Sequence, residues 1–154
     1  MQDTTPRKSN QVFRIRLGLA LLGLGFIIFV LGVDPAIFGL DRSAVFGFVQ
    51  IVVFLIGLAL ICIGGYVALN GLWVGKQKTI LADIAARIVA TGFVISVVSG
   101  LADIFGFGSH PFPNIPSFGG IQVVGVILGE VAIGLGFLLF VPNPRRDLST
   151  PDNN

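Results

Sequence analysis

The sequence predicts an all-α membrane protein, a bundle of four transmembrane helices built from two tandem helical hairpins. Three observations support this fold class: 54% of the 154 residues are hydrophobic, only 12% are charged, and the apolar residues gather in four long runs. Soluble domains carry about 25% charged residues, and a domain of this size could not bury so much apolar surface in water. Lipid is therefore the expected surrounding of most of the chain.

Four apolar runs are each long enough to cross a bilayer, because a spanning helix needs about 20 mostly apolar residues. The predicted helices cover residues 13–33, 46–69, 84–105 and 118–141. The first follows a basic flank, and no small-residue cleavage site follows it, so we expect it to be retained as a helix. The second contains one notable polar side chain, Gln50. The third contains hydroxyl side chains that include Ser96, and the fourth contains Gln122 and Glu130.

The polar ends, 1–11 and 142–154, are expected to be disordered cytoplasmic tails around one transmembrane domain, 12–141. Lys and Arg predict the orientation, because basic residues favour the cytoplasmic side of a membrane. Nine of the ten basic residues lie before or at the start of the first helix, between the second and third helices or at the start of the third, or after the fourth. Arg42 alone lies in the other loops. Both termini and the middle loop are therefore expected in the cytoplasm. A prokaryotic cytoplasmic membrane is the simplest assignment.

An internal duplication relates the second and fourth helices at an offset of 72 residues. Seven of nineteen positions are identical when residue 46 is aligned with residue 118, and both segments begin with Phe-Gly-x-x-Gln. The glutamines of this motif are Gln50 and Gln122. Because both hairpins start on the same side of the membrane, the repeat is parallel, and a pseudo-two-fold axis along the membrane normal is expected.

Each predicted helix carries a small or polar residue at every seventh position. These residues are Gly18, Gly25 and Gly32; Gly57, Gly64 and Gly71; Ala85, Gly92 and Ser99; and Gln122, Gly129 and Gly136. A seven-residue period places them on one face of a left-handed crossing, and helices in lipid approach one another through small residues. We therefore expect one compact bundle with large side chains turned to lipid or to a partner. Those large side chains are Phe26, Phe29, Phe54, Phe93, Phe137 and Phe140.

Glu130 is the one ionisable residue expected near the bilayer centre. A carboxyl group at that depth is costly and indicates a functional site by default. Without a basic residue at its depth, burial favours the neutral acid, with Ser96, Ser99 or a backbone carbonyl as hydrogen-bond partner. Three interpretations stay open: a structural hydrogen bond, a role in moving a proton or cation, and contact with another subunit. The equivalent residue of the first hairpin is Leu58, so the acid is not part of the repeated scaffold.

A mid-membrane glutamate on the fourth helix of a glycine-rich, duplicated hairpin resembles the proteolipid rotor subunits of vacuolar-type ATPases. The resemblance covers that helix and the overall layout. Two features depart from the family: the charge count places the hairpin tips outside, whereas a rotor turns them toward its cytoplasmic motor, and the glycine run on the first helix of each hairpin is irregular. We therefore transfer no rotor function to this chain.

The remaining residues form no catalytic, metal or cofactor motif, and no cofactor is expected. Nucleotide-binding, zinc-protease and Cys-x-x-Cys patterns do not occur. His110, the single histidine, lies in a predicted loop, so no pair of helical histidines exists to hold a haem. Gln50 and Gln122 are expected to bond a loop or one another across the pseudo-axis, with a ligand site between them as the alternative. Nucleic acid is not an expected partner, because no basic run with interleaved aromatics occurs.

Two further expectations concern charged residues near helix ends. Asp83 and Arg87 are four residues apart at the start of the third helix, a spacing that predicts an ion pair. Asp34 and Asp103 occupy equivalent positions of the repeat at the outer side of the membrane, where they are expected to cap loop backbone amides, with a weak cation site as the alternative.

We interpret the chain as a non-enzymatic integral membrane protein, an accessory or scaffold subunit of a larger membrane complex. Its expected partners are membrane lipid and other membrane subunits or copies of itself. The alternative is a small transporter or channel that passes a proton or small solute at Glu130, and an enzyme is the weakest possibility because polar groups are few. The direction in which the Glu130 side chain points discriminates between these functions. A channel needs the carboxyl group on a polar path, whereas a scaffold has it sealed between helices or turned toward a partner.

Overall fold

The computed structural model describes residues 5–39, 48–106 and 119–142. This part of the chain is all-helical, without a strand. Its elements are α1 (Thr5–Val33), the 3-10 helix η1 (Pro35–Phe38), α2 (Phe48–Leu72), α3 (Ile80–Gly100) and α4 (Gly120–Phe140). All four α-helices are long and apolar enough to cross a membrane. The predicted all-α class and the four apolar helices are thereby confirmed.

Local signals explain where several helices begin and end. α1 begins at Thr5, ahead of the predicted start at residue 13, so the helix also includes the polar flank. α3 begins at Ile80, where the Thr79 hydroxyl accepts the backbone N–H of Ala82 at 3.3 Å and caps the first turn. The turn after α3 closes on Gly106, whose φ of 79° suits a residue without a Cβ.

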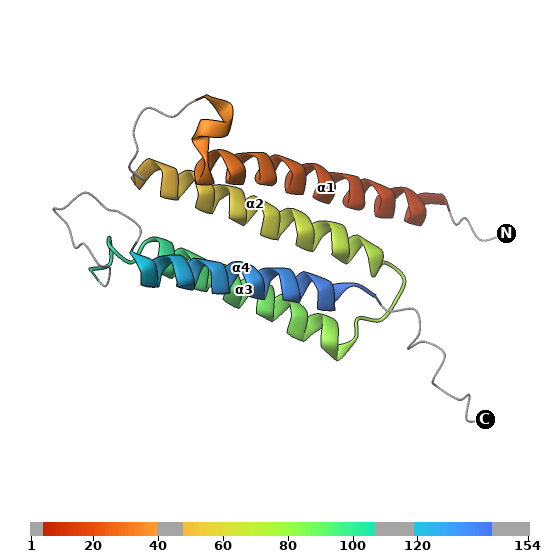
Figure 1. The fold of residues 1–154 in the computed structure, drawn as a ribbon. Coiled ribbons are helices and arrows are strands. Elements are labelled where there is room, and N and C mark those ends of the chain that lie inside the picture. The colour runs from red at the N-terminus through yellow and green to blue at the C-terminus, as the bar shows by residue number, and fades with distance from the viewer. Residues whose placement is uncertain (1–4, 40–47, 107–118, 143–154) are drawn as a thin grey trace.

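The helices pair as two hairpins, α1 with α2 and α3 with α4 (Figure 1). The first residues of α1 and α3 lie at the same end of the molecule, as the tandem arrangement requires. The hairpins meet through α2, which contacts both α3 and α4. Across the described ranges, α1 makes no close backbone approach to α3 or α4. The assembly is therefore less compact than expected, with α1 at its margin.

Small residues form the contact within each hairpin. A Cβ added to Gly57 on α2 would collide with the backbone of Phe29 on α1. The equivalent glycine of the second hairpin, Gly129 on α4, lies against α3, where an added Cβ would come within 2.6 Å of the Gly92 carbonyl oxygen. The seven-residue pattern read from the sequence thus lies along the two helix seams, where the backbones approach most closely.

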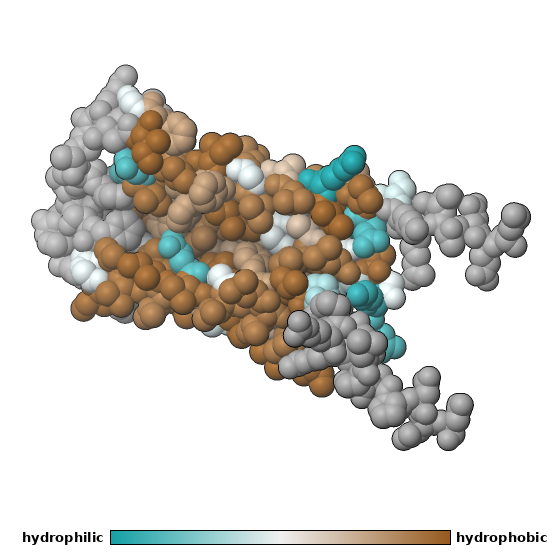
Figure 2. Space-filling view, turned by 45° about the vertical axis from the view of Figure 1, so that its right-hand side comes forward, coloured by the Kyte–Doolittle hydropathy of each residue, from teal (hydrophilic) through white to brown (hydrophobic). Residues whose placement is uncertain are grey.

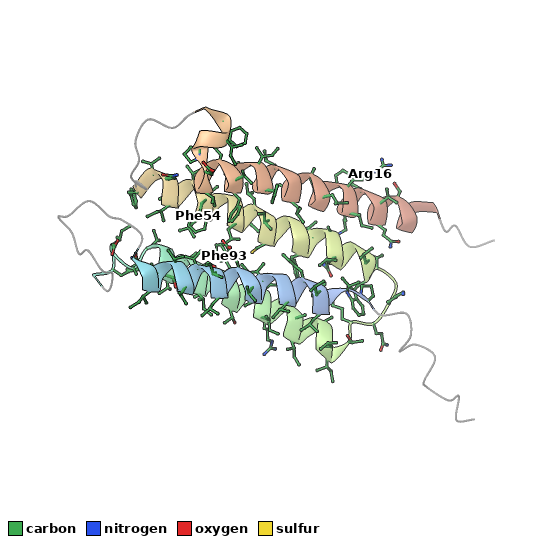
Figure 3. The ribbon with its side chains drawn as sticks, in the orientation of Figure 1. Arg16, Phe54 and Phe93 are labelled. Atoms are coloured by element: carbon green, nitrogen blue, oxygen red, sulfur yellow. The ribbon has the colours of Figure 1, made fainter. Side chains whose placement is uncertain are left out.

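Aromatic side chains fill the space between the hairpins, which corrects the expectation that they face outward. Phe54 is 3% exposed and Phe140 is 2% exposed. Phe93 of α3 packs against the same cluster as Phe54 of α2 (Figure 3), and Phe29 and Phe137 are partly buried there too. The expectation failed because α2 packs on two sides, with glycines against α1 and large side chains against α3 and α4. Of the six phenylalanines in question, Phe26 faces outward as expected, at 57% exposure.

The face of the molecule seen in Figure 2 is largely apolar, and its hydrophilic residues gather mainly toward one end. Exposed Lys and Arg side chains lie toward the end where α1 and α3 begin. They are Arg14, Arg16, Lys76, Lys78 and Arg87. The expected ion pair is confirmed, with Arg87 Nη2 lying 3.0 Å from Asp83 Oδ2 in an exposed position.

Candidate functional site: a groove at Glu130

A groove of about 330 Å³ lies between the first hairpin and α4. It exists because α1 and α4 each pack against α2 without approaching one another closely. α1 and α4 therefore form its walls, and buried Phe54 of α2 forms its floor. The lining residues are Phe29, Val33, Phe54, Val123, Val126, Ile127 and Glu130.

Glu130 supplies the single polar side chain of this lining. It is half-buried, and among the residues that the structure describes its carboxyl group has no hydrogen-bond or ion-pair partner. An unpaired carboxyl in apolar surroundings is unfavourable, so a donor or cation that enters the groove would be stabilised there. Because Glu130 lies midway along α4, the groove opens on the side of the bundle and not at one of its ends.

Ser96 of α3 packs against the side of α4 that faces away from the groove. It does not form the hydrogen bond with Glu130 that the sequence suggested. Its side chain is fully buried between α3 and α4, and its Oγ donates to the carbonyl oxygen of Val126 at 3.4 Å. In an α-helix the same carbonyl accepts the N–H of residue 130. Ser96 therefore fixes the turn of α4 that carries Glu130, but leaves the carboxyl group free to face the groove.

The angle between successive residues of an α-helix explains why Glu130 and Ser96 lie apart. Gly129 lies in the seam with α3, beside Ser96. The next residue of a helix with 3.6 residues per turn is rotated by about 100°, so Glu130 is carried out of the seam. The glycine pattern in the sequence already contained this signal, which our prediction of a serine partner did not use.

Gln122 has a capping role at the start of α4. Its side chain is 5% exposed, and its Oε1 accepts the backbone N–H of Gly119 at 2.7 Å. Gln50 occupies the same third position of α2 and is half-buried. No hydrogen bond joins the two glutamines within the part of the chain that is described. The two glutamines share the same position in their helices, but their contacts do not point to a ligand site between them.

The apolar residues of the groove could not be identified from the sequence, because nothing distinguishes them from the other apolar residues of their helices. The structure buries Asp103 to 7% exposure. The equivalent Asp34 is exposed, so the two aspartates differ in their surroundings. His110 and Arg42 lie outside the described residues.

The described residues contain no group of three His, Cys, Asp or Glu side chains that could hold a metal ion. Comparisons with protein-family models, with curated proteins and with solved structures return no match. The groove and its carboxyl group are therefore the basis for a functional proposal.

Proposed function

We propose that the chain is an integral membrane protein that acts as a non-enzymatic accessory subunit and seats a transmembrane helix of a partner protein in the groove at Glu130. The observation that carries the proposal is an unpaired carboxyl group in an otherwise apolar groove that opens laterally. A polar side chain placed at such a position is energetically costly unless another group completes it. A partner helix would complete it and would cover the apolar walls.

Helix length and surface chemistry support the membrane assignment. α3 and α4 each contain 21 residues, which corresponds to about 32 Å and matches a hydrocarbon core of about 30 Å. Large apolar side chains are exposed on every helix, including Leu24, Val49, Val94 and Leu138. We assign both termini and the α2–α3 loop to the cytoplasm, because the exposed basic residues gather toward that end.

Transport is the second candidate function, and the lining argues against it. A proton or ion path would need further polar side chains that lead to Glu130. The other six lining residues are apolar, while Ser96 is sealed between α3 and α4 and Gln122 caps the end of α4. The arrangement therefore favours a docked helix over a conducting path.

Site-specific photo-crosslinking in membranes of the native host tests the proposal. A photoreactive residue would replace Ile127, which lines the groove and is 51% exposed. The matched control is Leu128, which is 60% exposed on the same helix but outside the groove lining. We expect position 127 to capture one membrane protein in stoichiometric yield and position 128 to capture lipid.

The substitution Val123→Phe provides the second arm, because it fills the groove from an exposed position on α4. We expect it to abolish the protein adduct at position 127 without changing the amount of the chain in the membrane. If position 127 captured only lipid, and liposomes of the purified chain passed protons in a manner that Glu130→Gln abolished, the chain would be a transporter.

A further inference from the structure

We infer that the partner helix carries a basic side chain, Lys or Arg, at the depth of Glu130, so that the two residues form an ion pair within the groove. This inference rests on the proposed function and names the chemistry of the partner. It starts from the mismatch between the carboxyl group and its walls, since Glu130 has no partner among the described residues and the remaining lining is apolar.

The described part of the chain supplies no base at this depth. Its described Lys and Arg residues lie toward the end where α1 and α3 begin, on the first half of those helices or in the α2–α3 loop. Glu130 lies midway along α4, ten residues after Gly120 and ten before Phe140. A second copy of the chain would present the same helices and would bring no described base to that depth. Charge complementarity therefore favours a different protein.

Two aromatic rings that line the groove also favour a cation. Phe29 and Phe54 contact edge to face, with ring centroids 5.8 Å apart and an interplanar angle of 69°. Both rings line the groove that contains the carboxyl group. Aromatic ring faces attract Lys and Arg side chains, most strongly where water is excluded. A basic side chain in this groove would thus meet an anion on α4 and aromatic rings on α1 and α2.

An ion pair would lower the free energy of association, because it removes an unpaired group from each protein. A basic residue in the middle of a lone transmembrane helix is as unfavourable as a lone carboxyl group, and intramembrane charges are commonly paired. The base on one helix would offset the free-energy cost of burying the carboxyl group on the other, and the reverse. Free phosphate or a lipid headgroup does not offer this match, because a base is required and because headgroups lie at the membrane surface.

Binding of synthetic helices to the full-length protein in liposomes tests this inference. The helices share one Leu-Ala host sequence and differ in a single central guest residue, Lys, Ser or Leu, and energy transfer from a labelled chain measures association. We expect the Lys helix to bind about tenfold more tightly than the Leu helix, as an ion pair in an apolar site predicts. The Glu130→Gln variant should lose most of this preference, and Val123→Phe should weaken binding of every helix.

The outcomes separate this inference from the proposed function. Equal binding of the Lys and Leu helices, weakened by Val123→Phe, would overturn the ion pair while leaving a helix-docking groove. Equal binding of the Ser and Lys helices would assign Glu130 to an ordinary hydrogen bond and would also overturn it. A Lys preference that survives in Glu130→Gln would place the charge recognition elsewhere. If no helix bound, the inference would fall, and photo-crosslinking at position 127 would decide the proposed function separately.

Discussion

The indole Nε1 of Trp73 donates a hydrogen bond of 3.0 Å to the carbonyl oxygen of Phe140, 67 residues away in the chain. The bond connects the residue after α2 to the last residue of α4. The Phe140 ring packs at 6.4 Å from that of Trp73 and at 5.8 Å from that of Tyr66. Ala82 and Ala85 of α3 complete this buried cluster. Three helices therefore meet here, and the cluster joins the two hairpins at one end.

The substitution Trp73→Phe should weaken this junction. It keeps an aromatic ring but removes the donor and leaves the Phe140 carbonyl unpaired, which should lower the free energy of unfolding by about 1 kcal/mol. Denaturant titration in mixed micelles measures the change. The control is Leu72→Ala at the neighbouring, partly exposed position, for which a change within about 0.5 kcal/mol is expected. An unchanged midpoint for Trp73→Phe would show that the bond does not contribute to stability.

Alanine substitutions on α4 should distinguish seam glycines from surface glycines. A Cβ at position 129 would lie 2.6 Å from the Gly92 carbonyl oxygen and 2.9 Å from the Ser96 nitrogen, whereas a Cβ at position 134 would meet nothing within 4 Å. Gly129→Ala should therefore destabilise the fold by about 1–3 kcal/mol through overpacking.

Gly134→Ala is the matched control and should be neutral or stabilising by up to about 1 kcal/mol, because alanine favours the helix. The same unfolding titration measures both variants. Equal destabilisation by the two substitutions would mean that general glycine effects, and not the α3–α4 seam, determine the result.

Gln122→Leu should loosen the first turn of α4. The change removes the acceptor for the Gly119 N–H and leaves that end of the helix without its side-chain cap, which costs about 1 kcal/mol. Hydrogen exchange at the first turn should become faster. Gln122→Glu retains an acceptor and adds negative charge where the helix dipole favours it, so protection should be kept. Faster exchange in both variants would argue against capping by this side chain.

The pairing of helices could be predicted from the sequence because small residues at every seventh position are an unusual pattern in an apolar chain. Gly57 and Gly129 lie in the seams that this pattern implied. The second packing face of α2 could not be predicted. Its buried residues Ile51, Phe54 and Leu58 are as apolar as residues that face lipid, and in a membrane hydrophobicity does not separate the two environments.

The candidate site was predicted in part. The sequence identified Glu130 by its charge in an apolar helix, and in the structure Ser96 lies against the adjacent Gly129. The groove was not predictable, because it depends on α1 and α4 both packing on α2 without meeting. That arrangement leaves no trace in residue spacing.

The uneven packing of the hairpins also has a consequence for the order of synthesis. Each hairpin is held by contacts between helices adjacent in the chain, and such local contacts form early. The α1–α2 seam can therefore close while α3 and α4 are still being made. The groove has no second wall until α4 arrives, since Val123, Val126, Ile127 and Glu130 all belong to that helix. If the groove seats a partner helix as proposed, incomplete chains that lack α4 have no binding site and do not compete for that partner.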